Sequence, residues 1–293
     1  MAEKDFLKTL FESAIADKAS DIHIEPLTDK VQVRYRVDGI LREKYTFPLS
    51  EHEQFLNRIK VLSSLDIISH PAPQDGHFEF LHKERLLDVR VSIFPTITGE
   101  AMALRLMNRA EMLLDIESLE MDARTAMIFR KLISKIYGMV LITGPSGSGK
   151  TTMLYAILNE LQNKERNIVT LEDPVELRLE GTRQSQIRTE KGFTFAVGMR
   201  SILRQDPDVM IIGEIRDPET AEYAMRASLA GRIVFSTVHA NSSIGTIARL
   251  LDMKVERSLI AYAINGIISK RLVRKNCDGC RERYTPESQY LEY

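Results

Sequence analysis

The hydrophobic pattern of the first hundred residues predicts an α/β domain. Apolar side chains recur at helical spacing over Phe6–Ile15, which predicts an amphipathic helix. Apolar and polar residues then alternate over Ile22–Glu25 and Val31–Val37, as in strands with one buried face. Asp38-Gly39 follows directly and is a strong type I′ hairpin signal. A helix followed by a hairpin is therefore expected at the start of the chain.

The same alternation returns after a helical stretch near Phe55–Leu65. It covers Leu87–Ile93 and Ala101–Met107, and Thr98-Gly99 marks the turn between these two strands. These elements close a first domain over residues 1–107. An acidic segment without clear periodicity follows and predicts a linker over residues 108–122.

The second half of the chain has a different pattern. A helix carrying apolar residues over Phe129–Ile136 comes first, and short apolar runs then alternate with helical patterns. This order is typical of a parallel sheet covered on both faces. It predicts a second domain over residues 123–270 and a C-terminal segment over 271–293. The apolar runs are Met139–Thr143, Ile168–Leu171, Val209–Ile212 and Ile233–Thr237.

Composition excludes several functional classes. With 293 residues the chain exceeds one typical domain of about 100–200 residues. Forty basic and 41 acidic residues give a net charge of -1, so nucleic acid is not an expected partner. The uncharged runs Ile136–Gly149 and Ser258–Ser269 are shorter than the roughly 20 apolar residues of a membrane helix. The first residues lack a signal-peptide pattern, so a cytoplasmic location is expected.

The strongest chemical signal is a phosphate-binding loop. Residues 144–151 fit the pattern G-x-x-x-x-G-K-[ST] between an apolar run and a predicted helix. Glycines let backbone N–H groups turn toward a phosphate, Lys150 reaches the outer phosphate oxygens, and Thr151 is able to hold Mg²⁺. The predicted nucleotide-binding residues are Gly144, Pro145, Ser146, Gly147, Ser148, Gly149, Lys150, Thr151 and Thr152.

Polar residues also follow three other apolar runs. Glu214 ends the run Asp208–Glu214 where nucleotide hydrolases place an acid that organises Mg²⁺ and water, although Gly213 stands where an Asp is usual. Leu171–Glu176 carries three carboxylates, and His239 follows another run. Each feature has a purely structural alternative: a surface acid, turn-forming acids before a proline, and a structural histidine.

The order of these motifs resembles one known family. The phosphate loop, LEDPVE, the segment Arg200–Asp208, GEIRD and STVHAN follow one another as in the secretion ATPase superfamily. More narrowly, the chain resembles the type II secretion and type IV pilus assembly ATPases, including their competence-system relatives. SDIHIEP, RYRVDG, PQDG and DVRVS in the first domain also match, so the resemblance covers nearly the whole chain. Relatives often carry a platform-binding domain before this region, so a short variant or a trimmed chain is expected.

The resemblance implies a fold and an assembly. It implies a PAS-like N-terminal α/β domain plus a RecA-like P-loop ATPase domain with a mainly parallel sheet. It also implies a cytoplasmic homo-hexamer that lies at the inner face of the cell membrane and docks on an inner-membrane platform protein. ATP is the implied substrate and Mg²⁺ the implied cofactor.

The resemblance further implies roles for single residues. Glu214 matches the Walker B glutamate, which holds Mg²⁺ together with Thr151, and Glu176 matches a general base. His239 matches a histidine near the γ-phosphate. The implied cations at the nucleotide are Arg90 and Arg105 from the first domain, with Arg200 and Arg204 as further candidates. The alternative for each arginine is a solvated face or a surface ion pair.

Cys277 and Cys280 form a single C-x-x-C near the C-terminus. Relatives commonly carry two such pairs, and each pair supplies half of a tetrahedral zinc site. Zinc at Cys277 and Cys280 therefore requires ligands beyond this pair, and two bare thiols are the alternative.

The favoured function is a Mg²⁺-ATP hydrolase that powers assembly of type IV pili or type II pseudopili. A pilus retraction ATPase shares its catalytic motifs, although retraction motors generally lack the C-x-x-C. A nucleotide-gated scaffold with little turnover is the non-enzymatic alternative. A small-metabolite kinase shares the phosphate loop but leaves the other motifs unexplained, and near-neutral charge disfavours a helicase.

Overall fold

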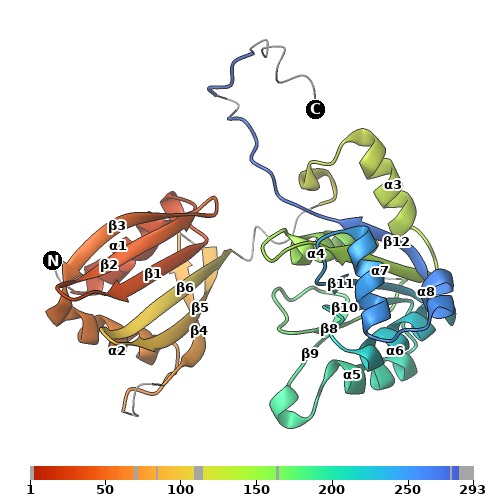
Figure 1. Cartoon of the computed structure of the whole chain (residues 1–293), viewed down its shortest axis with the longest axis horizontal. Coiled ribbons are helices and arrows are strands. Elements are labelled where there is room, and N and C mark those ends of the chain that lie inside the picture. Colours follow the sequence, from red (N-terminus) through yellow and green to blue (C-terminus); the bar gives the residue numbers. More distant parts are fainter. Residues whose placement is uncertain are drawn as a thin grey trace. The chain divides into compact units, whose positions relative to one another are not determined.

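The chain folds into two compact units, with the boundary between residues 113 and 114. The computed structural model describes residues 3–68, 72–83, 85–108, 115–162, 165–277 and 279–283 (Figure 1). Residues 109–114 of the predicted linker and 284–293 of the predicted C-terminal segment lie outside the described residues. Within the described part of the predicted linker, Ile116 is 2% exposed and packs in the core of the second unit.

The first unit is a six-stranded antiparallel sheet with two helices. The strands follow the order β3-β2-β1-β6-β5-β4, and every neighbouring pair is antiparallel. The elements are α1 (Glu3–Ala16), β1 (Asp21–Pro26), β2 (Lys30–Val37), β3 (Ile40–Pro48), α2 (His52–Leu62), β4 (Gln74–His82), β5 (Arg85–Thr96) and β6 (Gly99–Asn108).

The predicted hairpin is confirmed. Asp38 and Gly39 join β2 to β3, and both have positive φ angles of 51° and 79°, as a type I′ turn requires. The predicted alternation is also confirmed, because Val31, Val33 and Tyr35 of β2 are all buried. They belong to one core that contains buried residues of both helices. One face of the sheet is therefore covered by α1 and α2.

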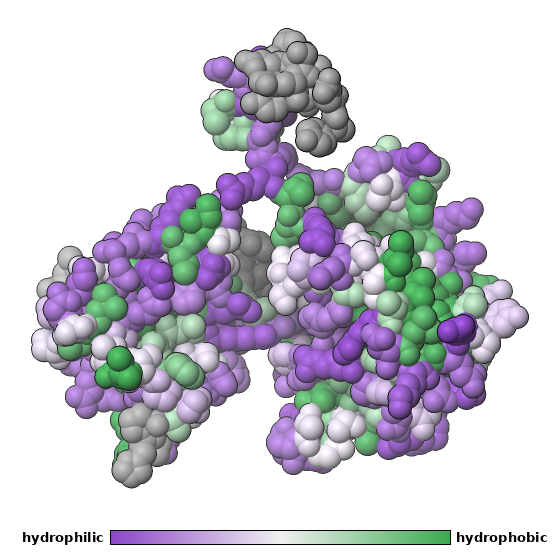
Figure 2. Space-filling model, in the orientation of Figure 1, coloured by the Kyte–Doolittle hydropathy of each residue, from purple (hydrophilic) through white to green (hydrophobic). Residues whose placement is uncertain are grey.

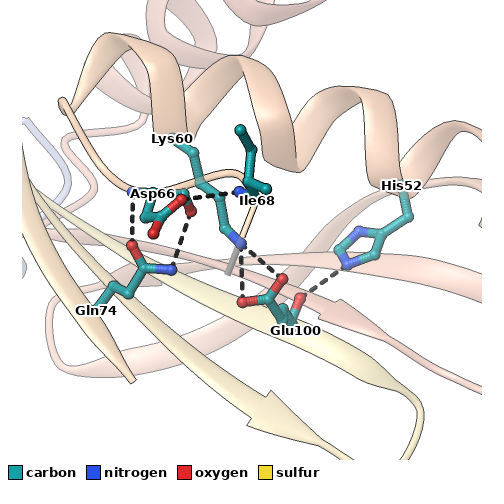
Figure 3. A network of polar contacts seen from close by, with 6 residues as sticks. All are labelled: His52, Lys60, Asp66, Ile68, Gln74 and Glu100. Atoms are coloured by element: carbon teal, nitrogen blue, oxygen red, sulfur yellow. Dashed lines mark hydrogen bonds and ion pairs between the residues drawn. The ribbon is translucent and has the colours of Figure 1, made fainter. Parts of the chain in front are cut away.

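A buried ion pair connects helix α2 to strand β6 (Figure 3). The Lys60 ammonium donates to both carboxylate oxygens of Glu100, at 3.0 and 2.8 Å. The side chains of Lys60 and Glu100 are only 4% and 13% exposed. His52, at the start of α2, has its Nε2 at 2.8 Å from the backbone carbonyl of the same Glu100. Three polar groups thus fix the position of α2 over the sheet.

The hydrogen bond determines the state of the His52 ring. A carbonyl oxygen only accepts, so Nε2 carries the hydrogen and Nδ1 is bare in the neutral ring. Nδ1 of His52 is buried without a hydrogen-bond partner. Protonation would bury an N–H without an acceptor, and burial accordingly lowers the pKa of His52.

The second unit is built around a six-stranded parallel sheet of order β12-β7-β11-β10-β8-β9. A short 3₁₀ turn at Glu117–Leu119 precedes it. The elements are α3 (Ala123–Ile133), β7 (Gly138–Thr143), α4 (Lys150–Leu161), β8 (Ile168–Glu172), β9 (Thr182–Gln186), α5 (Phe195–Ile202), β10 (Val209–Ile212), α6 (Pro218–Leu229), β11 (Ile233–Val238), α7 (Ser243–Asp252), α8 (Arg257–Ala263) and β12 (Ile264–Ser269).

Helices cover both faces of this sheet. Alternate residues of β7 enter different cores: Met139 packs with residues of α5, α6 and α8, whereas Val140 packs with residues of α3 and α4. The fold class predicted from the sequence, an α/β chain with a mainly parallel second sheet, is confirmed. The strand β9 was not predicted, because its sequence TRQSQ is polar and it lies at the sheet edge. The strand β12 was not predicted either, since it starts directly after α8.

The surface of the second unit includes an apolar patch over α7 (Figure 2). Ile244, Ile247 and Leu251 of this helix are 80%, 41% and 39% exposed. A contiguous apolar surface of this kind is typical of a protein interaction site. Within the described residues no helix combines the length and the hydropathy that crossing a bilayer requires.

The ion pair predicts a stability effect. We expect Lys60→Met to lower the free energy of unfolding of the first unit by about 3 kcal/mol, because it leaves the Glu100 carboxylate buried without its cation. Adding Glu100→Gln should regain at least half of this loss. Hydrogen exchange of β6 amides in the full chain measures both effects, and a double variant as unstable as the single one would contradict the explanation.

The His52 ring predicts a pH effect. Its folded pKa lies below the usual value of about 6.5, so below that pH the unfolded chain takes up a proton that the folded chain does not. We expect the stability of the first unit to fall as the pH drops below about 6.5. In His52→Gln, which keeps a donor for the Glu100 carbonyl, the decline should be shallower. Parallel pH curves for the variant and the parent chain would argue against this role.

Candidate nucleotide-binding site

The predicted phosphate loop joins strand β7 to helix α4. Every residue of β7 is buried, so the strand ends at a fixed point in the sheet. The loop then runs from Gly144 to Gly149, which caps α4 with a φ of 80°. Gly147 also has a positive φ, of 74°. The loop needs glycine at these turns, because other residues adopt such angles only at a cost.

Gly144 is additionally required by close packing. Its φ is 149°, and a Cβ here would lie 2.3 Å from the Lys270 carbonyl oxygen and 2.6 Å from the Ser148 hydroxyl. Lys270 follows β12, the strand that pairs with β7. The residue that follows β12 therefore packs directly against the phosphate loop and leaves no room for a side chain at position 144.

Lys150 lies at the start of α4 and folds over the loop. Its ammonium donates to the carbonyl oxygens of Gly144 at 2.9 Å and Pro145 at 3.0 Å. Burial lowers the pKa of Lys150, and the negative charge of Glu214 partly offsets this effect. The nearby Ser148 hydroxyl is buried without a partner. Lys150 is thus hydrogen-bonded to the loop, and the Ser148 hydroxyl of the same loop has no hydrogen-bond partner within the protein.

A second lysine approaches the same loop. Lys270 donates from Nζ to the Gly149 carbonyl at 3.2 Å, and burial lowers the pKa of Lys270. The sequence motif gave no indication of this residue, because Lys270 is 120 residues further along the chain than Lys150. Only the pairing of β12 with β7 brings it there.

Glu214 follows β10 at the edge of the sheet where the phosphate loop lies. It is 8% exposed and lies between Arg216 and His239. Arg216 contacts one carboxylate oxygen at 2.5 Å, and His239 Nε2 lies 3.4 Å from the other. Both partners are more than half exposed. The buried Glu214 carboxylate therefore contacts two side chains, Arg216 and His239, that are themselves exposed to solvent.

Hydrogen bonds between strand ends hold this edge together. The single hydrogen of the Thr143 hydroxyl is shared between the carbonyls of Ala240 at 2.7 Å and Val238 at 3.0 Å, and the Thr237 hydroxyl donates to the Gly213 carbonyl at 2.7 Å. The segments that carry His239 and Glu214 are thereby fixed to the strand before the phosphate loop.

The predicted residues of four motifs converge on one pocket of about 250 Å³. Its lining includes Lys150, Thr151, Glu176, Glu214 and His239. The expectation that parallel strands bring their carboxyl ends to one edge explains this convergence. Their catalytic roles stay predictions.

The first glutamate of LEDPVE is buried in a hydrogen-bonded network. The Glu172 carboxylate accepts from the Tyr155 hydroxyl at 2.5 Å, from the Thr170 hydroxyl at 2.6 Å and from the Gln184 amide at 3.0 Å. Glu172 is 6% exposed. The oxygens of Glu172 are occupied by protein donors, so Glu172 has a structural role, although Glu172, Asp173 and Glu176 all line the pocket.

The donor set of the pocket fits Mg²⁺. The Thr151 hydroxyl and the Glu214 carboxylate offer hard oxygen atoms, which this ion prefers, and Mg²⁺ keeps several waters and substrate oxygens as further ligands. Among the described residues, no three His, Cys, Asp or Glu side chains gather as an all-protein metal site. A site with few protein ligands is the usual arrangement for a nucleotide-bound Mg²⁺.

Arg200 and Arg204, the two arginines of the second unit that the resemblance implies at the nucleotide, do not line the pocket. Arg200 pairs with Glu219 and lies 6.0 Å from the Tyr223 ring centre. Arg204 donates to the Arg200 carbonyl at 2.7 Å. Arg200 and Arg204 therefore have partners on their own surface, and their role at a nucleotide stays a prediction.

Arg90 and Arg105, the two arginines of the first unit that the resemblance implies at a nucleotide, are neighbours on the sheet face opposite α1 and α2. Arg90 of β5 pairs in register with Arg105 of β6, and Arg105 in turn pairs with Asp21 of β1. The Arg105 guanidinium contacts Asp21 at 2.8 Å and is 65% exposed. Burial raises the pKa of Asp21, but the hydrogen bonds from Arg105 and Ser20 outweigh it and lower the pKa.

The two thiols lie in a short turn. The N–H groups of Cys280 and Arg281 both donate to the Cys277 carbonyl, at 3.3 and 2.9 Å. Cys277 and Cys280 are exposed and free. The Gly279 N–H and then the Cys280 side chain lower the pKa of Cys277. A zinc ion here still requires ligands beyond this pair.

The fold and the site define the class of protein. A glycine-rich loop between a buried parallel strand and a helix, with a buried carboxylate at the end of a neighbouring strand, is the architecture of the P-loop nucleotide-binding proteins. Residues 2–292 match the model of the type II/IV secretion system protein family. The chain belongs to this family, as the sequence motifs predicted.

Curated relatives narrow the resemblance. The chain is 44% identical over 283 residues to "Type II secretion system ATPase E" of Vibrio cholerae, covering 97% of this chain and 56% of the relative. It is 43% identical over 270 residues to "Type IV pilus assembly ATPase PilB" of Myxococcus xanthus, covering 92% of this chain and 48% of the relative. The chain thus spans about half the length of these relatives.

Solved structures agree with the fold. The Legionella pneumophila ATPase DotB has a TM-score of 0.73 and 25% identity, covering 92% of this chain and 76% of that chain. The pilus retraction motor PilT with bound ADP has a TM-score of 0.66 and 29% identity, covering 90% of this chain and 77% of that chain.

Sequence reasoning missed Arg216, Tyr155 and Lys270. Arg216 had a local signal, because it lies two residues after Glu214 in GEIRD. Tyr155 and Lys270 are recognised only from their contacts with LEDPVE and the loop.

Close packing at Gly144 predicts a binding defect. We expect Gly144→Ala to weaken binding of a fluorescent ATP analogue by at least about tenfold, because the new methyl group would displace the loop. Gly192→Ala is the matched control: Gly192 has a φ of 74° and nothing within 4 Å of an added Cβ. Gly192→Ala should keep the parent affinity, and equal affinities for the two variants would contradict the role of close packing at Gly144.

Proposed function

We propose that this chain binds Mg²⁺-ATP and hydrolyses it as the motor of a type II secretion or type IV pilus assembly system. The observation that supports this function is the convergence of Lys150, Thr151, Glu176, Glu214 and His239 on one pocket. These side chains supply a cation, a hydroxyl, two carboxylates and an imidazole. Phosphoryl transfer to water needs these groups for positioning and for charge stabilisation.

Phosphate binding is assigned to the loop and Lys150. The loop and the first turn of α4 offer backbone N–H groups to phosphate oxygens. Lys150 releases the carbonyls of Gly144 and Pro145 when a phosphate offers better acceptors. Because Lys150 is already buried in the free protein, the exchange costs little extra desolvation.

Water activation is assigned to the two carboxylates. Glu214 is held between Arg216 and His239 and stays close to Lys150, so it is placed to orient water at the phosphate side of the pocket. Glu176 accepts the proton of the attacking water, and His239 meets charge near the γ-phosphate. Bound Mg²⁺ would supply positive charge on the phosphate oxygens, with Thr151 and Glu214 as its protein-side contacts.

Further positive charge is assigned to arginines. Arg105 is more than half exposed on a face where it shares a row with Arg90, and a phosphate would compete with Asp21 for its guanidinium. Arg200 and Arg204 are further candidates for a nucleotide bound to another subunit.

The assembly proposed is a homo-hexamer that docks on a membrane platform protein at the inner face of the cell membrane. The family membership and the names of the relatives support this assignment. The exposed apolar patch of Ile244, Ile247 and Leu251 on α7 supports contact with another protein surface. The 44% identity to a secretion ATPase and 43% to an assembly ATPase favour these functions over retraction, for which the PilT structure has 29%.

ATP hydrolysis measured over a range of protein concentrations tests the proposal. We expect a Lys150-dependent rate per subunit that rises with concentration, because sites completed by neighbours mature on assembly. Glu214→Gln should lower the rate by at least about a hundredfold while an ATP analogue still binds. Lys150→Ala should lose both binding and turnover. A rate indifferent to both substitutions, at matched folding, would leave a nucleotide-gated scaffold as the better reading.

A further inference from the structure

A buried tyrosine connects the phosphate-loop helix to LEDPVE. Tyr155 lies on α4, whose first residue is Lys150, and it is 2% exposed. Its hydroxyl oxygen accepts hydrogen bonds from the backbone N–H of Glu176 at 3.1 Å and of Leu177 at 3.2 Å. The same hydroxyl donates to Glu172 at 2.5 Å. One phenol therefore holds both ends of the acidic segment.

The hydrogen-bonding capacity of this phenol is fully used. A tyrosine hydroxyl has one hydrogen to donate and two lone pairs to accept, and all three are engaged. Burial and the neighbouring Glu172 raise the pKa of Tyr155, so the donated hydrogen stays in place over the physiological range. The phenol is thus a fixed three-way connection.

Gln184 of β9 completes the support from the other side. Its amide nitrogen donates to Glu172 at 3.0 Å and to the Leu177 carbonyl at 2.9 Å, and its amide oxygen accepts from the Leu179 N–H at 2.8 Å. The segment that carries Glu176 has no regular secondary structure between β8 and β9. Its backbone is therefore positioned by side chains, chiefly those of Tyr155 and Gln184.

We propose that Tyr155 is a positioning residue for hydrolysis: its hydroxyl couples the phosphate-loop helix to the backbone of Glu176, so that the phosphate-binding and proton-accepting groups keep one geometry. This inference rests on the proposed function. Tyr155 acts through Glu176, because its hydroxyl is occupied by the protein and has no hydrogen left for a ligand. A displacement of about 1 Å at a reacting group is enough to cost about a hundredfold in rate.

Tyr155→Phe tests the inference, because it removes only the hydroxyl. We expect kcat for ATP to fall by about tenfold or more, with KM and the affinity for an ATP analogue within about twofold of the parent chain. Hydrogen exchange of peptides covering residues 173–179 should accelerate. Gln184→Met, which removes the second support without changing α4, should shift kcat and exchange in the same direction.

The matched control is Tyr35→Phe in the first unit. The Tyr35 hydroxyl donates to the Leu10 carbonyl at 2.8 Å and is equally buried, so its loss tests a general cost in stability. We expect Tyr35→Phe to lower thermal stability while kcat and exchange at residues 173–179 stay unchanged. A similar fall in kcat for both tyrosine variants would overturn the positioning role.

A double-substitution cycle shows whether Tyr155 acts through Glu176. In a Glu176→Gln background, Tyr155→Phe should change the residual rate by less than about twofold, because the positioned group is already absent. Fully additive effects would overturn the inference, as would parallel losses of kcat and nucleotide affinity. If the parent chain shows no Lys150-dependent hydrolysis, the proposed function itself fails. A hydrolysing parent with an unaffected Tyr155→Phe overturns the inference alone.

Discussion

The parallel register of four central strands is the constraint on which the second unit depends. Thr143 of β7 lies opposite Val238 of β11, and Ile212 of β10 lies opposite Leu171 of β8, so all four strands end at one edge. Each chain segment leaves the sheet there with a polar group that the apolar interior excludes. The phosphate loop, the two acidic segments and the histidine segment meet because their strands are buried and cannot slide without exposing a core face.

Buried charge at this edge is kept near opposite charge. Lys150 is stabilised by loop carbonyls and by the field of Glu214, and Glu214 in turn contacts Arg216 and His239. A low-dielectric pocket strengthens these interactions and makes an unpaired ion costly. A phosphate that enters such a pocket replaces existing partners instead of meeting solvated ions. The buried Glu172 carboxylate of the acidic segment is stabilised differently. It accepts hydrogen bonds from uncharged hydroxyl and amide groups instead of pairing with a cation.

In the first unit, buried charge is likewise paired with opposite charge, here under a sheet that has helices on one face. Helices α1 and α2 cover its apolar face, and the Lys60–Glu100 pair is tolerated there because each ion has two contacts with the other. The opposite face has no helix within the described residues, and it carries the row that contains Arg90 and Arg105. Uncovered strand faces favour polar residues, which explains why arginines are accommodated there.

The sequence by itself determined the two halves of the fold, the hairpin at Asp38-Gly39 and the phosphate loop, because periodicity and glycine-rich turns are local properties. It also indicated Glu176, Glu214 and His239, because polar residues that follow buried parallel strands lie at the carboxyl edge of the sheet. Tertiary structure alone decided the rest. Strand β9 has no apolar pattern because it lies at an edge, and Lys270 reaches the loop only through the pairing of β12 with β7. The bonds of Tyr155 join segments about twenty residues apart, and hydrogen bonds over such separations leave no periodic trace in a sequence.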